Sequence, residues 1–444
     1  MGNLFSIGAS GLRNAQAQLD TIGNNISGYT TDGYTRQVVS TTEAPQSGGA
    51  VQVGSGVFTG DATREYDGLL NNQRNSAYSA QYDYQARQDG LNKLDSLYTY
   101  SSQDDVSLDK RINAFFTAAT TLAQDPTSTA GRQTVLSNGQ SMANAFNSLS
   151  SRLQTYEASA DGDINDNIDK VNTYGQQISE LNEKISKVRA QTNAEPNDLL
   201  DQRDLAVRNL SKVVGIEVIA QNGDQLNVSL SNGSTLVAGD SHFDLQRSKA
   251  SELKGGTLGG TIEFRYGELA TARTNLNNLA SAVISQVNGV QTQGYDLNGK
   301  KGSALLAVKD SAPDAAAGIS VAITDPDKVA AAAAPDSGPK DNRNALKLAD
   351  LQNQRFTIGS TLTSFSEAYA SNVSQIGTSV VDITARTKAQ SVVTAQLEQK
   401  QQSLSGVNRD EEVANLSLYQ RYYQANAKVL STANTLIDTI LQLA

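Results

Sequence analysis

Among the segments of this sequence, a glycine-rich one most resembles a site of chemistry. Residues 294–300 have the glycine and lysine spacing of a phosphate-binding loop, but Lys301 stands where a magnesium-binding Ser or Thr is required. Such a loop also follows a buried strand, whereas a helical pattern with a polar end precedes this segment. We therefore expect a glycine-rich turn and no nucleotide site.

A second segment imitates a calcium loop. Asp161, Asp163 and Asn165 match the first ligand positions, but position six is Asp166 instead of glycine. Position twelve is Asn172 instead of a glutamate that binds through both oxygens. An acidic helix start, favoured by the helix dipole, explains these carboxylates without an ion.

Catalytic residue types are scarce. The chain has no cysteine and a single histidine, His242, so disulfides, thiolate metal sites and multi-histidine metal clusters are excluded. His242 lies in the polar segment 240–244, where a solvated side chain is expected rather than a general base. No Gly-x-Ser-x-Gly motif occurs. The sequence thus predicts no enzyme, no cofactor and no metal site.

Composition narrows the possible partners. Only 38% of the 444 residues are hydrophobic and 6% are aromatic, which is lean for a compact enzyme. The formal net charge of -10 argues against nucleic acid or an anionic membrane as a partner. No run of eighteen apolar residues could span a bilayer. The first thirty residues lack the features of a cleaved secretory signal, so we expect any export to leave the N-terminus uncleaved.

The two ends of the chain carry its most regular pattern, with apolar residues at alternating steps of three and four. The front stripe is Leu12, Ala15, Leu19, Ile22 and Ile26, and the back stripe is Leu416, Tyr423, Ala427, Leu430, Ile437 and Leu441. Gln420 and Asn434 occupy two expected core positions of the back stripe, where polar groups lower stability and fix register. The pattern predicts helices that pair with each other, are loose in the isolated chain, and become ordered in an assembly.

The middle of the chain is predicted to be mainly helical. Apolar residues spaced three or four positions apart predict long helices within residues 65–122, 129–155, 164–188, 198–213, 267–290 and 344–404, with a break at Asp125-Pro126. Alternating apolar residues and the turn pairs Asn222-Gly223 and Asn232-Gly233 predict an antiparallel β element over 216–237, continued by 259–266.

The order of these elements predicts domains that are each built from segments of both halves of the chain. The expected parts are a terminal-helix core domain from 1–45 and 405–444, a helical domain from 46–212, 267–293 and 341–404, a small β-rich element at 213–266, and a short insertion at 294–340.

Residues 24–36, Asn-Asn-Ile-Ser-Gly-Tyr-Thr-Thr-Asp-Gly-Tyr-Thr-Arg, closely resemble the N-terminal signature of the flagellar axial family of rod, hook and hook-associated proteins. Residues 405–412 and the helix that follows look like the C-terminal signature of one member of that family. Internal segments agree in order: Asp125-Pro126 with Arg132-Gln133, residues 197–204, Gly294-Tyr295-Asp296 with Gly299 and Gly302, and Asp325-Pro326 with Asp341-Asn342.

The resemblance implies a mainly α fold, with long helices in a discontinuous elongated domain that carries a small antiparallel β element. It also implies paired N- and C-terminal coiled-coil helices. Larger members carry an outer domain after a segment like 294–302. Only about forty residues occupy that place here, so the large outer domain is expected to be missing or reduced.

The resemblance further implies a structural subunit at the junction between flagellar hook and filament, secreted through the flagellar type III channel. Its implied partners are copies of itself in a tubular assembly, the hook protein, the next hook-associated protein toward the filament, and a type III export chaperone. Another flagellar axial protein or a soluble coiled-coil scaffold is the alternative. The candidate subunit contacts are Leu12, Leu19, Ile22, Ile26, Tyr29, Tyr34, Leu416, Gln420, Tyr423, Leu430, Asn434, Ile437 and Leu441. For residues 24–36, a simple connector within one subunit remains open.

Overall fold

The computed structural model describes residues 2–44, 54, 56–103, 107–192, 194–221 and 225–443, without the side chains of residues 2, 3, 100–103, 441 and 443. The chain is mainly α, which confirms the predicted fold class. It divides into two compact units. Unit 1 comprises Met1–Asp83, Asn167–Gly259 and Ala389–Ala444, and unit 2 comprises Tyr84–Asp166 and Gly260–Lys388. The predicted turn at Asn222-Gly223 lies outside the described residues.

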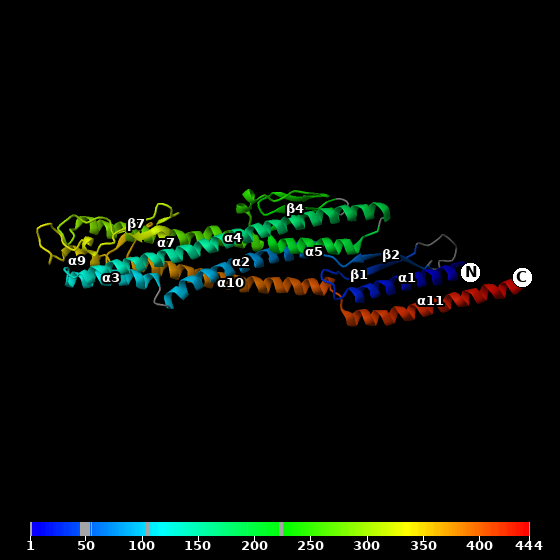
Figure 1. Cartoon of the computed structure of the whole chain (residues 1–444). Helices are drawn as coiled ribbons and strands as arrows, with labels where there is room; N and C mark the ends of the chain where they lie inside the picture. The colour runs from blue at the N-terminus through cyan, green and yellow to red at the C-terminus, as the bar shows by residue number, and fades with distance from the viewer. Residues whose placement is uncertain are drawn as a thin grey trace. The chain divides into compact units, whose positions relative to one another are not determined.

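Unit 1 joins the two terminal helices to a β-hairpin and a small sheet (Figure 1). Its elements are α1 (Gly2–Gly28), β1 (Gln37–Glu43), β2 (Val57–Arg64), the first part of α2 (Gly68–Gln103), the last part of α4 (Thr129–Thr192), α5 (Asn197–Val213), β3 (Ile216–Ala220), β4 (Leu226–Leu230), β5 (Thr235–Ala238), β6 (Ser241–His242), the 3-10 helix η1 (Arg247–Glu252), the start of α6 (Gly256–Glu263), the end of α10 (Phe365–Ser405) and α11 (Arg409–Leu443). The strands β1 and β2 pair antiparallel, and the second sheet has the antiparallel order β3-β4-β5-β6.

The predicted β element forms because one helix covers it. Asn182 on α4 is fully buried, donates its amide to the Leu226 carbonyl at 2.9 Å and accepts the Leu226 N–H at 3.2 Å. Gly175 on the same helix lies against Leu236 of β5, so the helix and the sheet approach closely. The turn between β4 and β5 places Gly233 at φ +81°, as the Asn232-Gly233 pair predicts.

Unit 2 holds the remaining elements and a continuous apolar core. They are the rest of α2, α3 (Leu108–Gln124), the first part of α4, the end of α6, the π-helical turn η2 (Phe264–Glu268), α7 (Leu269–Gln293), β7 (Leu306–Val308), α8 (Ala315–Gly318), β8 (Ile319–Val321), the 3-10 turn η3 (Pro326–Lys328), α9 (Arg343–Asp350), β9 (Phe356–Ile358), β10 (Thr361–Thr363) and the rest of α10. Phe116 and Phe365 belong to this core and stack with ring centroids 5.7 Å apart.

The break between α3 and α4 falls at Asp125-Pro126, as predicted, and a buried arginine secures it. The guanidinium of Arg132, 1% exposed, donates to the Pro126 carbonyl at 3.0 and 2.7 Å and also to the Val329 carbonyl. The segment that resembles the flagellar family at this point therefore holds backbone in place.

The structure corrects the predicted strand at residues 259–266, which instead belong to α6 and η2. The alternation of Ile262 and Phe264 imitates a strand. However, Leu258, Ile262 and Leu269 recur at helical spacing and are all buried. Burial of that helical face determines the local structure.

Two further corrections concern helix boundaries. The calcium-like residues 161–172 lie in the middle of α4, not at a helix start, and Asp161 pairs with Arg265 at 3.4 Å. The predicted helical stretch 344–404 is interrupted by the hairpin of β9 and β10, where Gly359 adopts φ +64°. A glycine at that conformation favours a tight turn over a continuing helix.

Candidate functional site

The terminal helices α1 and α11 lie side by side, which confirms that the two ends of the chain pair (Figure 1). Glycines let them approach closely. A Cβ atom placed on Gly11 would lie 2.3 Å from Oδ1 of Asn426, and one on Gly8 would lie 3.1 Å from Cγ of Leu430. Asn426 and Leu430 therefore pack directly onto the backbone of α1.

The predicted stripe of α1 faces inward. Ala15 and Ile22 are buried, while Leu12, Leu19 and Ile26 are half-buried. A hairpin lies along the same helix, since Gln18 donates its amide to the Val39 carbonyl of β1 at 3.0 Å. The periodicity thus identifies the packed face of the first helix.

The predicted stripe of α11 is covered at only some of its positions. Leu416 and Leu430 are half-buried, whereas Tyr423, Ala427 and Ile437 are exposed. Gln420 and Asn434 are exposed too, so within one chain they are not the buried polar positions that the pattern indicated. The side chain of Leu441 lies outside the described residues.

Residues that the sequence reasoning missed complete the contact on α11. Glu412 and Ala433 are buried, and Asn426 and Val429 approach the glycines of α1. Glu412 and Asn426 are polar and give no hydrophobic signal, while Val429 and Ala433 lie one position away from the predicted stripe.

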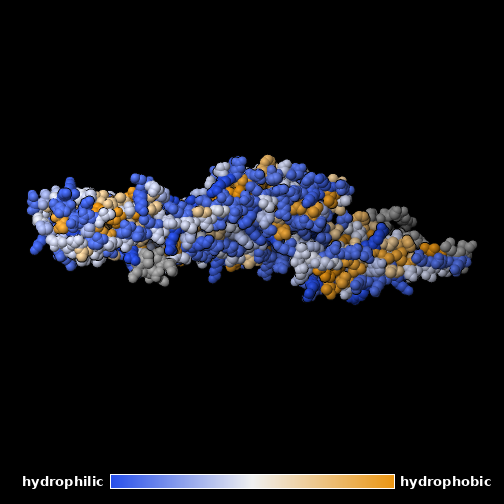
Figure 2. All heavy atoms as spheres, viewed as in Figure 1, coloured by the Kyte–Doolittle hydropathy of each residue, from blue (hydrophilic) through white to orange (hydrophobic). Residues whose placement is uncertain are grey.

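A single α1 leaves much apolar surface of α11 uncovered. The exposed apolar surface of α11 comprises Val413, Leu418, Tyr422, Tyr423, Leu436, Ile437 and Ile440. Figure 2 shows apolar side chains gathered over the terminal helices. Exposed apolar groups of this kind are typical of surfaces that bind another protein surface.

The connector, residues 24–36, is organised around a buried asparagine. Asn25, 1% exposed, accepts the Tyr34 hydroxyl and the Gln37 N–H, each at 2.9 Å, and donates to the Gln37 carbonyl at 2.9 Å. All polar atoms of its side chain are thereby paired. Asn25 fixes the turn that leads from α1 into β1.

Two glycines of the connector have specific roles. A Cβ on Gly28 would lie 2.5 Å from the ring of Tyr34, so the ring closes directly over the end of α1. Gly33 adopts φ +87°, a conformation that disfavours other residues. Tyr29, in contrast, is 53% exposed. Tyr34 therefore serves the fold of the connector, and Tyr29 remains available to a partner.

Polar bonds tie the connector to α5 and α11. The Thr35 N–H donates to Asp201 at 3.0 Å, Arg208 pairs with Asp32 at 2.6 Å, and Arg36 pairs with Glu412 at 2.8 Å. The Arg208 guanidinium lowers the pKa of Asp32. Burial alone would lower the pKa of Arg36, but the ion pair with Glu412 raises it. These bonds within one chain support the view that Thr35 and Arg36 belong to a connector inside one subunit.

Alkaline pH should loosen this region. Burial, together with the charges of Asp201 and Glu412, raises the pKa of Tyr34 to about 12. Unfolded tyrosines ionise near pH ~10, so the unfolded chain loses its proton first and stability falls between about pH 10 and 12. We expect the Tm of Tyr34→Phe to be lower than wild type at pH ~8, because the bond to Asn25 is lost, yet to fall less steeply from pH ~8 to ~11.

Thermal melts across that range, with exposed Tyr422→Phe as the control, measure the difference. Parallel curves for Tyr34→Phe and wild type would show that Tyr34 does not carry the alkaline sensitivity.

The segment that resembles a phosphate-binding loop forms a turn held by its own hydrogen bonds. In residues 294–300, the Asp296 carboxylate accepts the N–H groups of Asn298 and Lys300 at 2.9 and 2.8 Å, and Gly299 has φ +72°. This is the predicted glycine-rich turn.

Across the described ranges, no group of three His, Cys, Asp or Glu side chains could hold a metal ion. Nor does any helix in the described part of the chain have the length and apolar character to cross a membrane.

Comparisons with known proteins agree with this arrangement. A sequence model of the flagellar hook-associated protein FlgK helical domain matches residues 91–252 and 245–306. The C-terminal model of the flagellar basal body rod FlgEFG proteins matches residues 399–443, and the flagella basal body rod protein model matches residues 5–35. The two rod-protein matches fall on the end of α10 with α11, and on α1 with its connector.

Relatives cover the whole chain. Flagellar hook-associated protein 1 from Escherichia coli (strain K12) is 32% identical and covers 100% of both chains. The protein of the same name from Bacillus subtilis (strain 168) is 26% identical over 96% of this chain and 95% of its own length. The Escherichia coli alignment spans 550 positions, more than the 444 residues of this chain, so that relative carries segments this chain lacks.

A solved structure shares the fold. The flagellar hook junction protein FlgK from Burkholderia pseudomallei superposes with a TM-score of 0.67 at 20% identity, covering 75% of this chain and 100% of that one. Together with the full-length identity above, these matches show that the chain belongs to the flagellar hook-associated protein 1 family.

Proposed function

We propose that this chain, a structural protein of the flagellar hook–filament junction, joins hook to filament by self-assembly through α1 and α11. The observation that carries the proposal is the exposed apolar surface of α11, which α1 leaves uncovered. Removing that surface from water provides the driving force for association. Looseness of the pair in the isolated chain stays a prediction.

The proposed contacts with a neighbouring copy lie on α11 and at the tip of the connector, and α1 supports α11 from within the chain. A tube built from one subunit requires a heterologous contact, in which different faces of each copy meet. Leu12, Leu19, Ile22 and Ile26 hold α1 in place, while Tyr423, Ile437 and Leu441 are proposed to meet a neighbouring copy, with Gln420 and Asn434 fixing the register. Tyr29 is the connector residue proposed to touch a neighbour.

The proposed partners are copies of this chain, the hook protein, the next hook-associated protein toward the filament, and a type III export chaperone. The chain is proposed to be secreted into the flagellum without cleavage, and to bind neither nucleic acid nor membrane, given its net charge of -10. We propose that residues 1–45 and 405–444 act as one core domain, because α1, its connector and α11 share the contacts described above.

Antibody labelling tests the location. Gold particles directed against an exposed loop tag should mark the point where the filament leaves the hook in isolated flagella. Cells lacking the gene should carry hooks without filaments and release filament protein into the medium. Label along the whole filament, or filaments of normal length in the deletion strain, would contradict a junction subunit.

We also propose that the chain has no catalytic activity. An enzyme would have to use Lys300 and His242. Lys300 is exposed on the Asp296 turn, and the side chain of His242 is 36% exposed on the edge strand β6, 3.7 Å from Asp244. Surface substitutions of this kind usually change stability by less than ~0.5 kcal/mol. We therefore expect the double variant Lys300→Ala, His242→Ala to swim normally in soft agar. A non-motile strain with a folded, exported protein would point to chemistry or an essential contact at these residues.

A further inference from the structure

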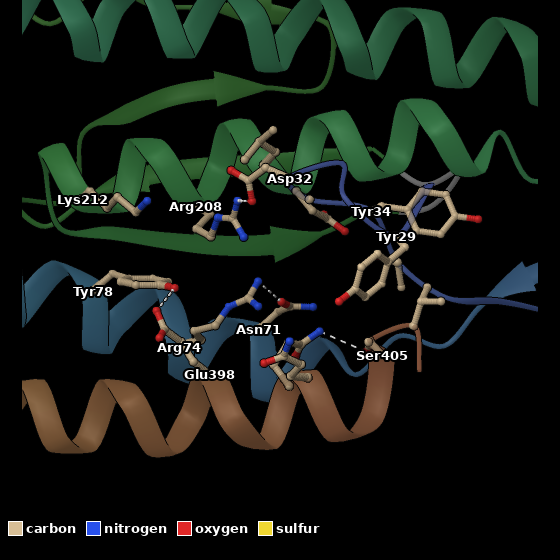
Figure 3. Close-up of a pocket in the computed structure, with 18 residues that line it drawn as sticks. Tyr29, Asp32, Tyr34, Asn71, Arg74, Tyr78, Arg208, Lys212, Glu398 and Ser405 are labelled. Carbon is tan, nitrogen blue, oxygen red and sulfur yellow. Dashed lines mark hydrogen bonds and ion pairs between the residues drawn. The ribbon is translucent and has the colours of Figure 1, made fainter. Parts of the chain in front are cut away.

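A polar cavity of about 440 Å³ lies in unit 1, beneath the connector. Figure 3 shows Arg208 and Lys212 projecting from α5 toward Arg74 and Tyr78 on α2. The end of α10 contributes Glu398 and two glutamines, and the connector closes one side. Three cationic side chains from two helices therefore converge on one space.

Two of the three cations have no carboxylate partner. Arg74 donates to the Asn71 amide oxygen at 2.7 Å, and Lys212 lies over the ring of Tyr78, 5.2 Å from its centroid. Among the described residues, neither forms an ion pair, whereas Arg208 pairs with Asp32 at the exposed rim. Burial lowers the pKa of both Arg74 and Lys212, and the charge of Arg208 lowers both further, against a weaker opposing effect of the Glu398 carboxylate.

The acidic residues that line the cavity bond to side chains other than Arg74 and Lys212. Glu398 accepts the Tyr78 hydroxyl, and Asp204 pairs with Arg64 at 2.8 Å. The side chain of Asp32 is 78% exposed, so solvent screens its charge. Glu398 and Asp204 attract Arg74 from a distance, and Glu398 and Asp32 attract Lys212, but none of these carboxylates forms an ion pair with either cation. Partly buried cations without a directly bonded carboxylate favour an anion that can hydrogen-bond to them.

We propose that this cavity binds an oxyanion group, a carboxylate or a phosphate, held by Arg74 and Lys212 with Arg208 beside them. The Arg74 guanidinium offers N–H donors in a planar fork, and the Lys212 ammonium supplies a point charge. The cavity volume exceeds that of a single ion, so we propose that the oxyanion is part of a larger ligand. The ring of Tyr78 lines the cavity and can pack against the rest of that ligand. The two possible sources are an acidic side chain of another protein segment and a phosphorylated small molecule.

The test uses the full chain at low concentration, titrated with sodium phosphate and with sodium acetate against sodium chloride of equal ionic strength. We expect at least one oxyanion to raise the Tm saturably, by about 2 °C at tenfold excess over its Kd. Phosphate stronger than acetate indicates a phosphorylated ligand. Acetate equal to or stronger than phosphate indicates a protein carboxylate.

Variants assign the effect to the cavity. Lys212→Gln and Arg74→Gln should each weaken binding about tenfold or more, Lys212→Arg should retain it, and exposed Lys249→Gln should match wild type. Circular dichroism checks that each variant is folded. If neither oxyanion exceeds chloride, or if folded Lys212→Gln binds as wild type does, the assignment is wrong.

Discussion

Ile437→Asp is expected to abolish incorporation of the chain at the junction while leaving the folded monomer intact. Ile437 is 37% exposed on the α11 surface that α1 does not cover, so its replacement costs the single chain little. In an assembly the same carboxylate would be buried without a partner, which costs several kcal/mol at each contact. Cells carrying the variant should make hooks without filaments, and the purified monomer should melt within about 1 °C of wild type.

Thr435→Asp is the matched control, because it adds the same charge two residues away. Thr435 is exposed on the polar face of α11 that also carries Lys428, Ser431 and Asp438. It should assemble normally. If Ile437→Asp cells swim normally, this flank of α11 is not part of the interface. If both variants lose assembly equally, the added charge alone causes the defect.

Leu430→Asp separates the two roles of the helix. Leu430 packs against Gly8, so a carboxylate there should disturb the pair within one chain as well as the assembly. The apolar rhythm of the sequence places Leu430 and Ile437 on one stripe and does not separate these roles. The structure separates them, because α1 covers the stripe at Leu430 and leaves it exposed at Ile437.

The first helix could be predicted well from its sequence, and the last one less well. On α1, apolar residues occupy one narrow face, so Ala15 and Ile22 are buried where the heptad rhythm places them. On α11, apolar residues cover a wider arc, and a heptad rhythm can be drawn through either flank. The flank that meets α1 includes Asn426 and Val429, which approach Gly11 and Gly8, and neither residue lies on the predicted stripe.

For the connector, the sequence predicts the turn but not the residues that the turn contacts. Its asparagines, glycines and tyrosines predict a tight turn, and the structure contains one. The partners of that turn are Asp201 and Arg208 on α5 and Glu412 on α11, which lie far away in sequence. Local pattern cannot supply such pairings, because they follow from the packing of distant helices. For the same reason the cavity between α2 and α5 has no sequence signal of its own.

Gly11→Leu is expected to separate the terminal helices within the chain. Even a Cβ at this position would lie 2.3 Å from the Asn426 side chain, so a leucine forces α11 away from α1 or displaces several side chains at once. Overpacking of this kind costs about 1–3 kcal/mol. Hydrogen exchange should show α1 peptides losing protection about tenfold or more, with unit 2 unchanged.

Gly23→Leu provides the control on the same helix, since a Cβ there meets no atom within 4 Å. It should keep or increase the protection of α1, because leucine favours helix more than glycine does. A compensating pair tests the same contact. Gly11→Ala should lower the protection of α1, and adding Asn426→Ala should restore it, because the amide that the new methyl group would strike is then absent. Equal loss of protection in Gly11→Leu and Gly23→Leu would mean that α1 tolerates no larger residue anywhere, and that close packing at Gly11 is not what holds the two ends together.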